Sequence, residues 1–142
     1  MSNDFFITKT TWSEEAEALK TIRESVFMQE QNVPAELEWD GEDESAVHLL
    51  ASDVQGAPIG CARILLDGHI GRMAVLKPWR GQGVGFSLLQ RAVEVVKRLG
   101  CREAFLYAQS YAIPFYERLG FIAEGEEFMD AGIPHRQMHL TL

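Results

Sequence analysis

The stretch Arg80-Gly81-Gln82-Gly83-Val84-Gly85 joins a short apolar run to a strongly amphipathic segment. Its glycines stand at alternate positions, so the backbone can pass close to a ligand with no Cβ in the way. The helix predicted to follow leaves its first amide groups unpaired, and its dipole adds partial positive charge at the same point. Such a turn is suited to hold an anion, most often a phosphate or pyrophosphate.

Two well-known glycine loops do not fit this stretch. A P-loop requires Gly-Lys-Ser/Thr, whereas the chain has Gly83-Val84. The dinucleotide fingerprint fails because Phe86 or Leu88 stands where its last glycine is required. The pattern that fits is Arg-x-x-Gly-x-Gly, which resembles the acetyl-CoA pyrophosphate loop of the GCN5-related N-acetyltransferase (GNAT) superfamily.

A second segment, residues 109–121, resembles the other signature of that superfamily. This signature is Asn-x-x-Ala-x-x-Phe-Tyr, followed by a basic residue, an apolar residue and Gly-Phe. The chain matches it at Ala112, Phe115, Tyr116, Arg118, Gly120 and Phe121, and has Gln109 where the pattern usually has Asn. The two motifs occur in the expected order and spacing, and the resemblance covers essentially the whole chain.

The periodicity and turn signals predict an order of elements that agrees with the resemblance. We expect strands near residues 5–11, 46–52, 59–66, 70–76, 104–108, 121–126 and 135–142. A helix capped by Ser13 is broken by Val33-Pro34, a main helix covers residues 82–99 and a short helix residues 114–119. The fold class is therefore α/β, the acyl-CoA N-acyltransferase fold, with a mixed and mostly antiparallel sheet flanked by helices. Residues 1–142 form a single domain.

The composition agrees with a globular intracellular protein. The 142 residues are 46% hydrophobic and 24% charged, and the net charge of −8 argues against nucleic acid as a partner. The first ten residues contain no long apolar run, so we expect neither a signal peptide nor a membrane span, and a cytoplasmic location. Cys61 and Cys101 are solitary and are interpreted as buried free thiols, and no spacing indicates a metal site.

The resemblance implies transfer of an acetyl group by direct attack of an amine on the thioester of acetyl-CoA. It assigns cofactor binding to the strand before the glycine loop, to the loop and to the second motif: Met73, Ala74, Val75, Arg80, Gly81, Gln82, Gly83, Val84, Gly85, Phe86, Gln109, Phe115, Tyr116 and Arg118. The strand pairs with the pantetheine through main-chain groups, and the Val75 amide faces the thioester oxygen. Arg80 adds positive charge beside the pyrophosphate.

Tyr116 is the residue expected at the leaving thiolate. A phenol is protonated at neutral pH and can donate a hydrogen bond to a thiolate, so we expect stabilisation by hydrogen bonding rather than full proton transfer. From the residues alone, packing against Phe115 as an ordinary aromatic pair is favoured. The resemblance reverses that preference.

On the acceptor side, Glu30 and His135 are the candidates for the base that takes a proton from the incoming amine. Glu30 follows the apolar run Val26-Phe27-Met28, so we expect it to be partly buried with a raised pKa. His135 lies at the start of the final strand, and histidine is suited to proton transfer near neutral pH. His48 is a lone histidine and is interpreted as structural. The acidic residues 36–44 favour a solvated loop, with attraction of a cationic amine as the alternative.

Segments 27–33, 36–40, 43–48 and 131–135 resemble the ElaA/YjcF-like subgroup, which has no defined substrate. The acceptor is therefore left open between a small-molecule amine and a peptide amine, and a homodimer is left open as well. A non-catalytic acyl-CoA-binding or sensing module is the alternative function. Tyr116 favours an enzyme over that module.

Overall fold

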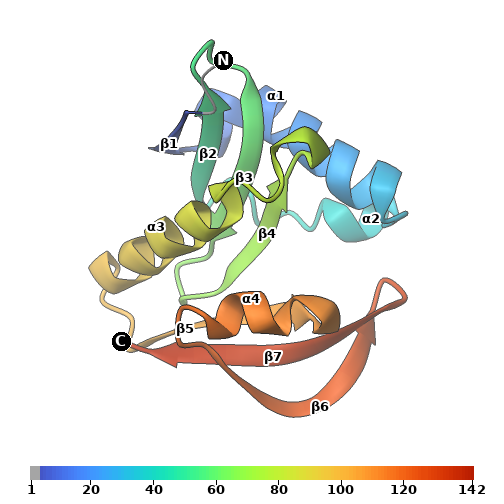
Figure 1. Ribbon diagram of the computed structural model, residues 1–142, viewed down its shortest axis with the longest axis vertical. Coiled ribbons are helices and arrows are strands. Elements are labelled where there is room, and N and C mark those ends of the chain that lie inside the picture. The colour runs from blue at the N-terminus through green and yellow to red at the C-terminus, as the bar shows by residue number, and fades with distance from the viewer. Residues whose placement is uncertain (1–3) are drawn as a thin grey trace.

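The computed structural model describes residues 4–142, so residues 1–3 of the predicted domain lie outside it. Strands and helices follow one another along the chain in the order expected from the sequence (Figure 1). In chain order these elements are β1 (Phe5–Thr10), α1 (Trp12–Arg23), η1 (Glu24–Glu30), α2 (Ala35–Glu38), β2 (Val47–Asp53), β3 (Pro58–Ile64), β4 (Ile70–Val75), η2 (Lys77–Trp79), α3 (Val84–Arg98), β5 (Glu103–Gln109), η3 (Ser110–Ala112), α4 (Ile113–Glu117), β6 (Ile122–Asp130) and β7 (Ile133–Thr141).

The strands form two antiparallel sheets rather than one continuous sheet. The first sheet has the order β1-β2-β3-β4 and the second has the order β5-β7-β6. They are joined by an isolated parallel bridge between His69 and Phe105, at the start of β4 and β5. Beyond this bridge β4 and β5 separate, and the opening between them lies between the upper and lower parts of the molecule (Figure 1).

Helices cover the two faces of the first sheet. The apolar stripe predicted for the main helix is buried, with Val84, Leu88 and Val96 packed in the larger core. A Cβ added at Gly60 would lie 3.1 Å from the Ala74 carbonyl oxygen and 3.2 Å from Leu88 Cδ1, so a side chain at this position would prevent α3 from packing this closely. On the opposite face, α1 contributes Leu19 and Ile22, and η1 contributes Val26, to a second buried cluster with Leu50, Cys61 and Ala74. Burial raises the pKa of the Cys61 thiol to about 12, so it stays protonated.

Some local predictions were wrong at the ends of the helices. Thr11, not Ser13, caps α1, because its side-chain oxygen accepts a hydrogen bond from the Glu14 amide. The main helix begins at Val84 rather than at residue 82, and Leu99 at its end is exposed. Both cysteines are free, but Cys101 is half-buried. None of the helices between residues 4 and 142 is long and apolar enough to cross a membrane.

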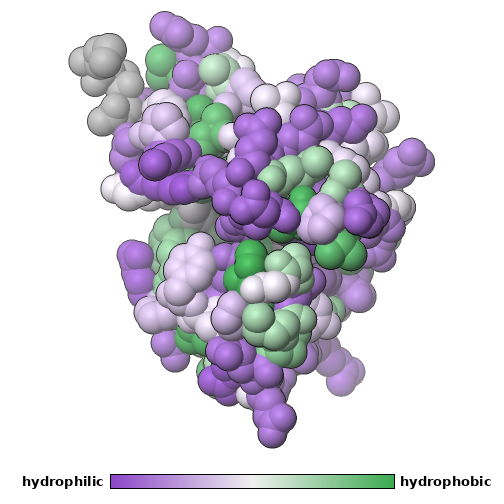
Figure 2. Space-filling model, turned by 90° about the vertical axis from the view of Figure 1, so that its right-hand side faces the viewer, coloured by the Kyte–Doolittle hydropathy of each residue, from purple (hydrophilic) through white to green (hydrophobic). Residues whose placement is uncertain are grey.

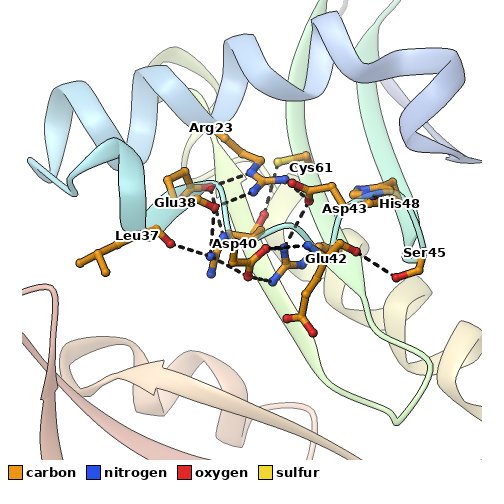
Figure 3. Close-up of polar contacts among 11 residues, drawn as sticks. Arg23, Leu37, Glu38, Asp40, Glu42, Asp43, Ser45, His48 and Cys61 are labelled. Carbon is orange, nitrogen blue, oxygen red and sulfur yellow. Dashed lines mark hydrogen bonds and ion pairs between the residues drawn. The ribbon is translucent and has the colours of Figure 1, made fainter.

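The acidic segment 36–44 is the largest departure from the sequence-based expectation. It is not simply a solvated loop, because Glu38 and Asp43 are buried. Figure 3 shows both carboxylates facing Arg23 of α1, whose guanidinium is 2.7 Å from Glu38 Oε2 and 2.6 Å from Asp43 Oδ1. Arg63 of β3 pairs with both oxygens of Asp40, at 2.8 and 2.9 Å, and reaches Asp43 at 3.3 Å. The segment is thereby fastened to α1 and to the first sheet.

His48 belongs to the same buried region. Its Nε2 lies 2.8 Å from the Asp43 carbonyl oxygen, which can only accept, so the ring donates this hydrogen bond. Burial lowers the pKa of His48, which favours the neutral ring. Trp12 packs against the ring at a centroid distance of 5.5 Å. These contacts support the structural interpretation of His48.

Candidate active site

A cleft of about 580 Å³ opens where β4 and β5 separate. Its walls come from both sheets and from the short helical segments η1, α2, η3 and α4. β4 contributes its residues 70–75, η1 contributes Glu30, and Gln31 follows at the end of η1. Across the cleft lie Tyr107 and Gln109 of β5, Tyr116 of α4 and His135 of β7. Residues from the predicted cofactor motifs and from the predicted acceptor side therefore share one cavity.

The glycine loop is open toward solvent at the start of α3. Gly81 and Gly83 have φ values of +76° and +88°, and a Cβ at either position would have no neighbouring atom of the described chain within 4 Å. Gly83 is the N-cap of α3, and the Ser87 amide donates to its carbonyl oxygen at 3.0 Å. The amides of Val84, Gly85 and Phe86 precede that hydrogen bond, so the helix does not use them. The loop therefore offers unpaired amides and free space, as an anion site requires.

Arg80 lies between the glycine loop and the acceptor side. Its Nε donates to the Val75 carbonyl oxygen at 2.9 Å, and its two terminal nitrogens contact Glu30 at 3.0 and 2.8 Å. The expectation that Glu30 is partly buried was wrong, because its side chain is exposed at the end of η1. A phosphate that binds Arg80 has to compete with the Glu30 carboxylate.

The edge of β4 that faces the cleft carries unpaired backbone groups. The Leu76 amide donates to Ile59 of β3, whereas the Val75 carbonyl accepts from Arg80 on the other side. Because successive residues of a strand direct their polar groups to opposite edges, the Val75 amide also faces the cleft. This orientation supports the role expected of the Val75 amide.

Residues of the second motif hold α4 against the start of α3. A Cβ at Gly85 would lie 3.5 Å from the Phe115 ring, and that ring meets Phe86 edge to face at 6.1 Å. The Arg118 guanidinium lies over the Phe86 ring, 4.7 Å from its centroid. In this structure Phe86 and Phe115 contribute packing, and Arg118 places positive charge near the helix start.

Tyr116 packs and also lines the cleft. Its ring lies 5.1 Å from that of Phe115 and 6.3 Å from that of Phe121. Burial raises the pKa of Tyr116 to about 12, with a smaller contribution from Tyr111. The hydroxyl is therefore protonated throughout the neutral range and is available as a hydrogen-bond donor. Tyr116 can therefore pack against the neighbouring rings and still offer its hydroxyl as a hydrogen-bond donor.

His135 is buried at the acceptor side. Its Nδ1 lies 2.7 Å from the Ile133 carbonyl oxygen, so Nδ1 carries a hydrogen and donates it. In the neutral ring Nε2 is then left with a lone pair, which is what a proton acceptor needs. Nearby, Gln109 Nε2 donates to Gln31 Oε1 at 2.9 Å and links β5 to η1.

The comparisons with known proteins agree with this geometry. A family model described as the acetyltransferase (GNAT) domain matches residues 9–142. The chain belongs to the GNAT family. It is 40% identical to YjcF of Bacillus subtilis, an uncharacterized N-acetyltransferase. The aligned 122 residues cover 82% of this chain and 86% of that protein. The crystal structure of an acyl-CoA N-acyltransferase from Pseudomonas aeruginosa superposes with a TM-score of 0.86 and 32% identity, over 96% of this chain and 99% of that one. Escherichia coli ElaA superposes with a TM-score of 0.85 and 29% identity, over the same shares of the two chains.

GNAT membership confirms the resemblance, the fold class and an acyltransferase that uses acyl-CoA. The open loop, the unpaired amides and the cleft-facing edge of β4 fit a cofactor of that kind. The sequence did not single out Gln31, Arg72 or Tyr107, all of which line the cleft. A charged residue inside the otherwise apolar strand 70–76 was the available signal for Arg72.

Arg72 links the buried network to the cleft. The pairing of β3 with β4 shifts register between Cys61 and Arg63, and on the partner strand Arg72 has a φ of +47°. Its guanidinium contacts the carbonyl oxygens of Leu37 and Glu38 and the carboxylate of Asp40, at 3.1 to 3.2 Å. The acidic segment therefore holds a strained position of β4 at the wall of the cleft.

Replacing Gly83 by Val is expected to abolish the rise in melting temperature that acetyl-CoA gives the parent protein. Valine resists a φ of +88° and would place a branched side chain in the open loop. For the parent, a ligand at a hundred times its Kd adds about 2.7 kcal/mol of stability. Thermal unfolding with and without acetyl-CoA measures the difference.

Gly100→Val is the matched control. Gly100 follows the other end of α3 with a φ of +85°, and it too has free space around its Cβ position within the described chain. This variant should lose similar stability yet keep the acetyl-CoA-induced rise. A Gly83→Val protein that keeps the full rise would show that the loop does not hold the cofactor.

Proposed function

We propose that this protein transfers the acetyl group of acetyl-CoA to a primary amine by direct attack of the amine on the thioester. The observation that carries the proposal is that one cleft brings together three groups. These groups are the Arg80 guanidinium beside the glycine loop, the Tyr116 hydroxyl and the His135 ring, whose Nδ1 donates to the Ile133 carbonyl oxygen. Acetyl-CoA supplies the activated thioester when it binds.

The reaction requires two proton movements. An alkyl ammonium is almost fully protonated at neutral pH and cannot attack until it loses a proton. As the nitrogen bonds to the carbonyl carbon, the carbon–sulfur bond breaks and its electron pair leaves with the sulfur. Of the two protons that the ammonium loses, one leaves through the base to water and the other ends on the thiol.

We assign the first proton to His135 in preference to Glu30. His135 is buried beside the cleft, and its hydrogen bond to the Ile133 carbonyl fixes the tautomer that leaves Nε2 free. Glu30 is exposed and its carboxylate is shared with Arg80 through two contacts. Glu30 remains the second candidate, because a phosphate bound to Arg80 would compete for that guanidinium.

Tyr116 is the group we assign to the leaving sulfur. With a pKa of about 12 its hydroxyl is a weaker acid than a thiol, whose ordinary pKa is near 8.5. Complete proton transfer to the thiolate is therefore unfavourable, and Tyr116 acts by donating a hydrogen bond. A non-catalytic acyl-CoA sensor would need neither this hydroxyl nor the free nitrogen of His135.

Replacing Tyr116 by Phe should keep acetyl-CoA binding and lower kcat by about 10²–10⁴-fold, the range of contributions from acid–base groups. Because the pKa of Tyr116 lies at about 12, the parent hydroxyl stays protonated, and the ratio of the two rates should be constant from pH 7 to about pH 10. Thiol release from acetyl-CoA in the presence of an active amine measures both rates. Tyr111→Phe is the control, since Tyr111 also lines the cleft but is highly exposed. A Tyr116→Phe rate within twofold of the parent rate would leave the residue with packing alone.

Replacing His135 by Ala should lower kcat/KM and remove the acidic limb of its pH profile, because the group that must be unprotonated is gone. Glu30→Gln should keep that limb. Initial rates over a pH series for the parent and both variants decide between the two candidates. If His135→Ala retains the parent's limb and plateau while Glu30→Gln loses them, the assignment is reversed. If neither variant changes the profile, water bound to the backbone is the better account of the base.

A further inference from the structure

An array of aromatic rings lies on one face of the second sheet. Tyr107 of β5 and Phe128 of β6 meet edge to face at 5.8 Å, and Phe128 stacks on His135 of β7 at 5.9 Å. His69 continues the array, 5.1 Å from Tyr107 and stacked on Phe105 at 5.0 Å. Strand pairing explains the arrangement, because Phe128 and Gln109 both lie opposite His135 and residues that face each other share a side of the sheet.

The rings adjoin the acceptor side of the cleft and are accessible from it. Tyr107, His69 and His135 line the cleft, and Tyr107 and Phe128 are 45% and 39% exposed. Figure 2 shows hydrophobic residues gathered around the middle of this side of the molecule, on which α2 and the turn between β6 and β7 lie in Figure 1. Burying such rings against solvent is favourable, so this surface is suited to an apolar group of a ligand.

The charges around the cleft favour a cation next to that apolar group. The arginines that line it are already paired, Arg72 with Glu38 and Asp40, and Arg80 with Glu30. Asp130, at the end of β6, also lines the cleft, and its carboxylate has no salt-bridge partner within residues 4–142. Burial lowers the pKa of His69, so this ring is neutral at neutral pH and does not repel an ammonium group.

We propose that the acceptor is a primary amine joined by a short linker to an aromatic ring. The ring of the substrate packs on Tyr107 and Phe128, the ammonium group enters beside Asp130, and the nitrogen reaches Nε2 of His135. This inference rests on the proposed acetyl transfer and names its substrate class. A polyamine lacks the ring that the array would bury, and a short alkylamine offers less surface to bury.

The test compares two amines that differ in one group. With acetyl-CoA held constant, kcat/KM is measured for 2-phenylethylamine and for ethylamine by thiol release, and spermidine is included as a polycation. We expect kcat/KM for 2-phenylethylamine to exceed that of each of the other two by at least about tenfold, which corresponds to about 1.4 kcal/mol, because its ring adds buried apolar area and aromatic contacts. Equal values, or a preference for spermidine, would overturn the inference.

Variants of the ring residues test whether these residues cause the preference for the aromatic amine. Tyr107→Ala should reduce the ratio of kcat/KM between 2-phenylethylamine and ethylamine to within about threefold. Phe6→Ala is the matched control, because Phe6 is an exposed ring on β1 and does not line the cleft. Phe128→Ala replaces Tyr107→Ala if that variant does not fold, as judged by its melting temperature. An unchanged ratio in the variant would overturn the assignment of the ring site.

Failure of this inference can be distinguished from failure of the proposed function. Acetyl-CoA that raises the melting temperature, together with transfer to amines without an aromatic preference, overturns the substrate class and leaves acetyl transfer standing. The absence of any acetyl-CoA-induced rise overturns both.

Discussion

Two buried arginines hold the acidic segment 36–44 against α1 and the first sheet. Arg23 and Arg63 are 1% and 2% exposed, and a charged guanidinium at such a position is tolerated only with carboxylate partners. Those partners are Glu38, Asp40 and Asp43, all from the acidic segment 36–44. Removing one partner of such a buried ion pair would leave an uncompensated buried charge, which lowers the free energy of unfolding by about 3–5 kcal/mol. The segment is therefore fixed to α1 and β3 through its buried carboxylates.

The same network shapes the cleft. Arg72 contacts the carbonyl oxygens of Leu37 and Glu38, so the position of α2 and the conformation of β4 are coupled. A non-glycine residue with a φ of +47° is costly by itself, by about 1–2 kcal/mol, and these contacts offset the cost. On the other wall, packing of Phe115 against Gly85 places Tyr116. One wall is thus held by charges and the other by aromatic packing.

The sequence predicted those parts of the fold and site that depend on local patterns. The glycine loop, the apolar stripe of α3 and the second motif are each contained in a short stretch, and Arg80, Gln109 and Tyr116 from the two motifs line one cleft. What it did not predict depends on distant partners. The acidic run has the composition of a solvated loop, and only its contacts with Arg23 and Arg63 show that part of it is buried. Glu30 is likewise held by a partner outside its own segment, Arg80, which lies fifty residues away. The contact between Gln31 and Gln109 spans 78 residues. Neither charge patterning nor periodicity contains such information.

The central claim is that acetyl-CoA binds between β4 and β5, with its pyrophosphate at the start of α3. Amide hydrogen exchange, measured by mass spectrometry with and without acetyl-CoA, tests it most directly. The account predicts slower exchange in segments 73–75 and 81–86, because the Met73 and Val75 amides face the cleft and the first amides of α3 are not used by the helix. It predicts unchanged exchange in residues 12–23. Unchanged exchange in both segments would contradict the account. Slowing confined to the hollow of about 320 Å³ lined by Trp12, Lys20 and Trp39 would contradict it as well.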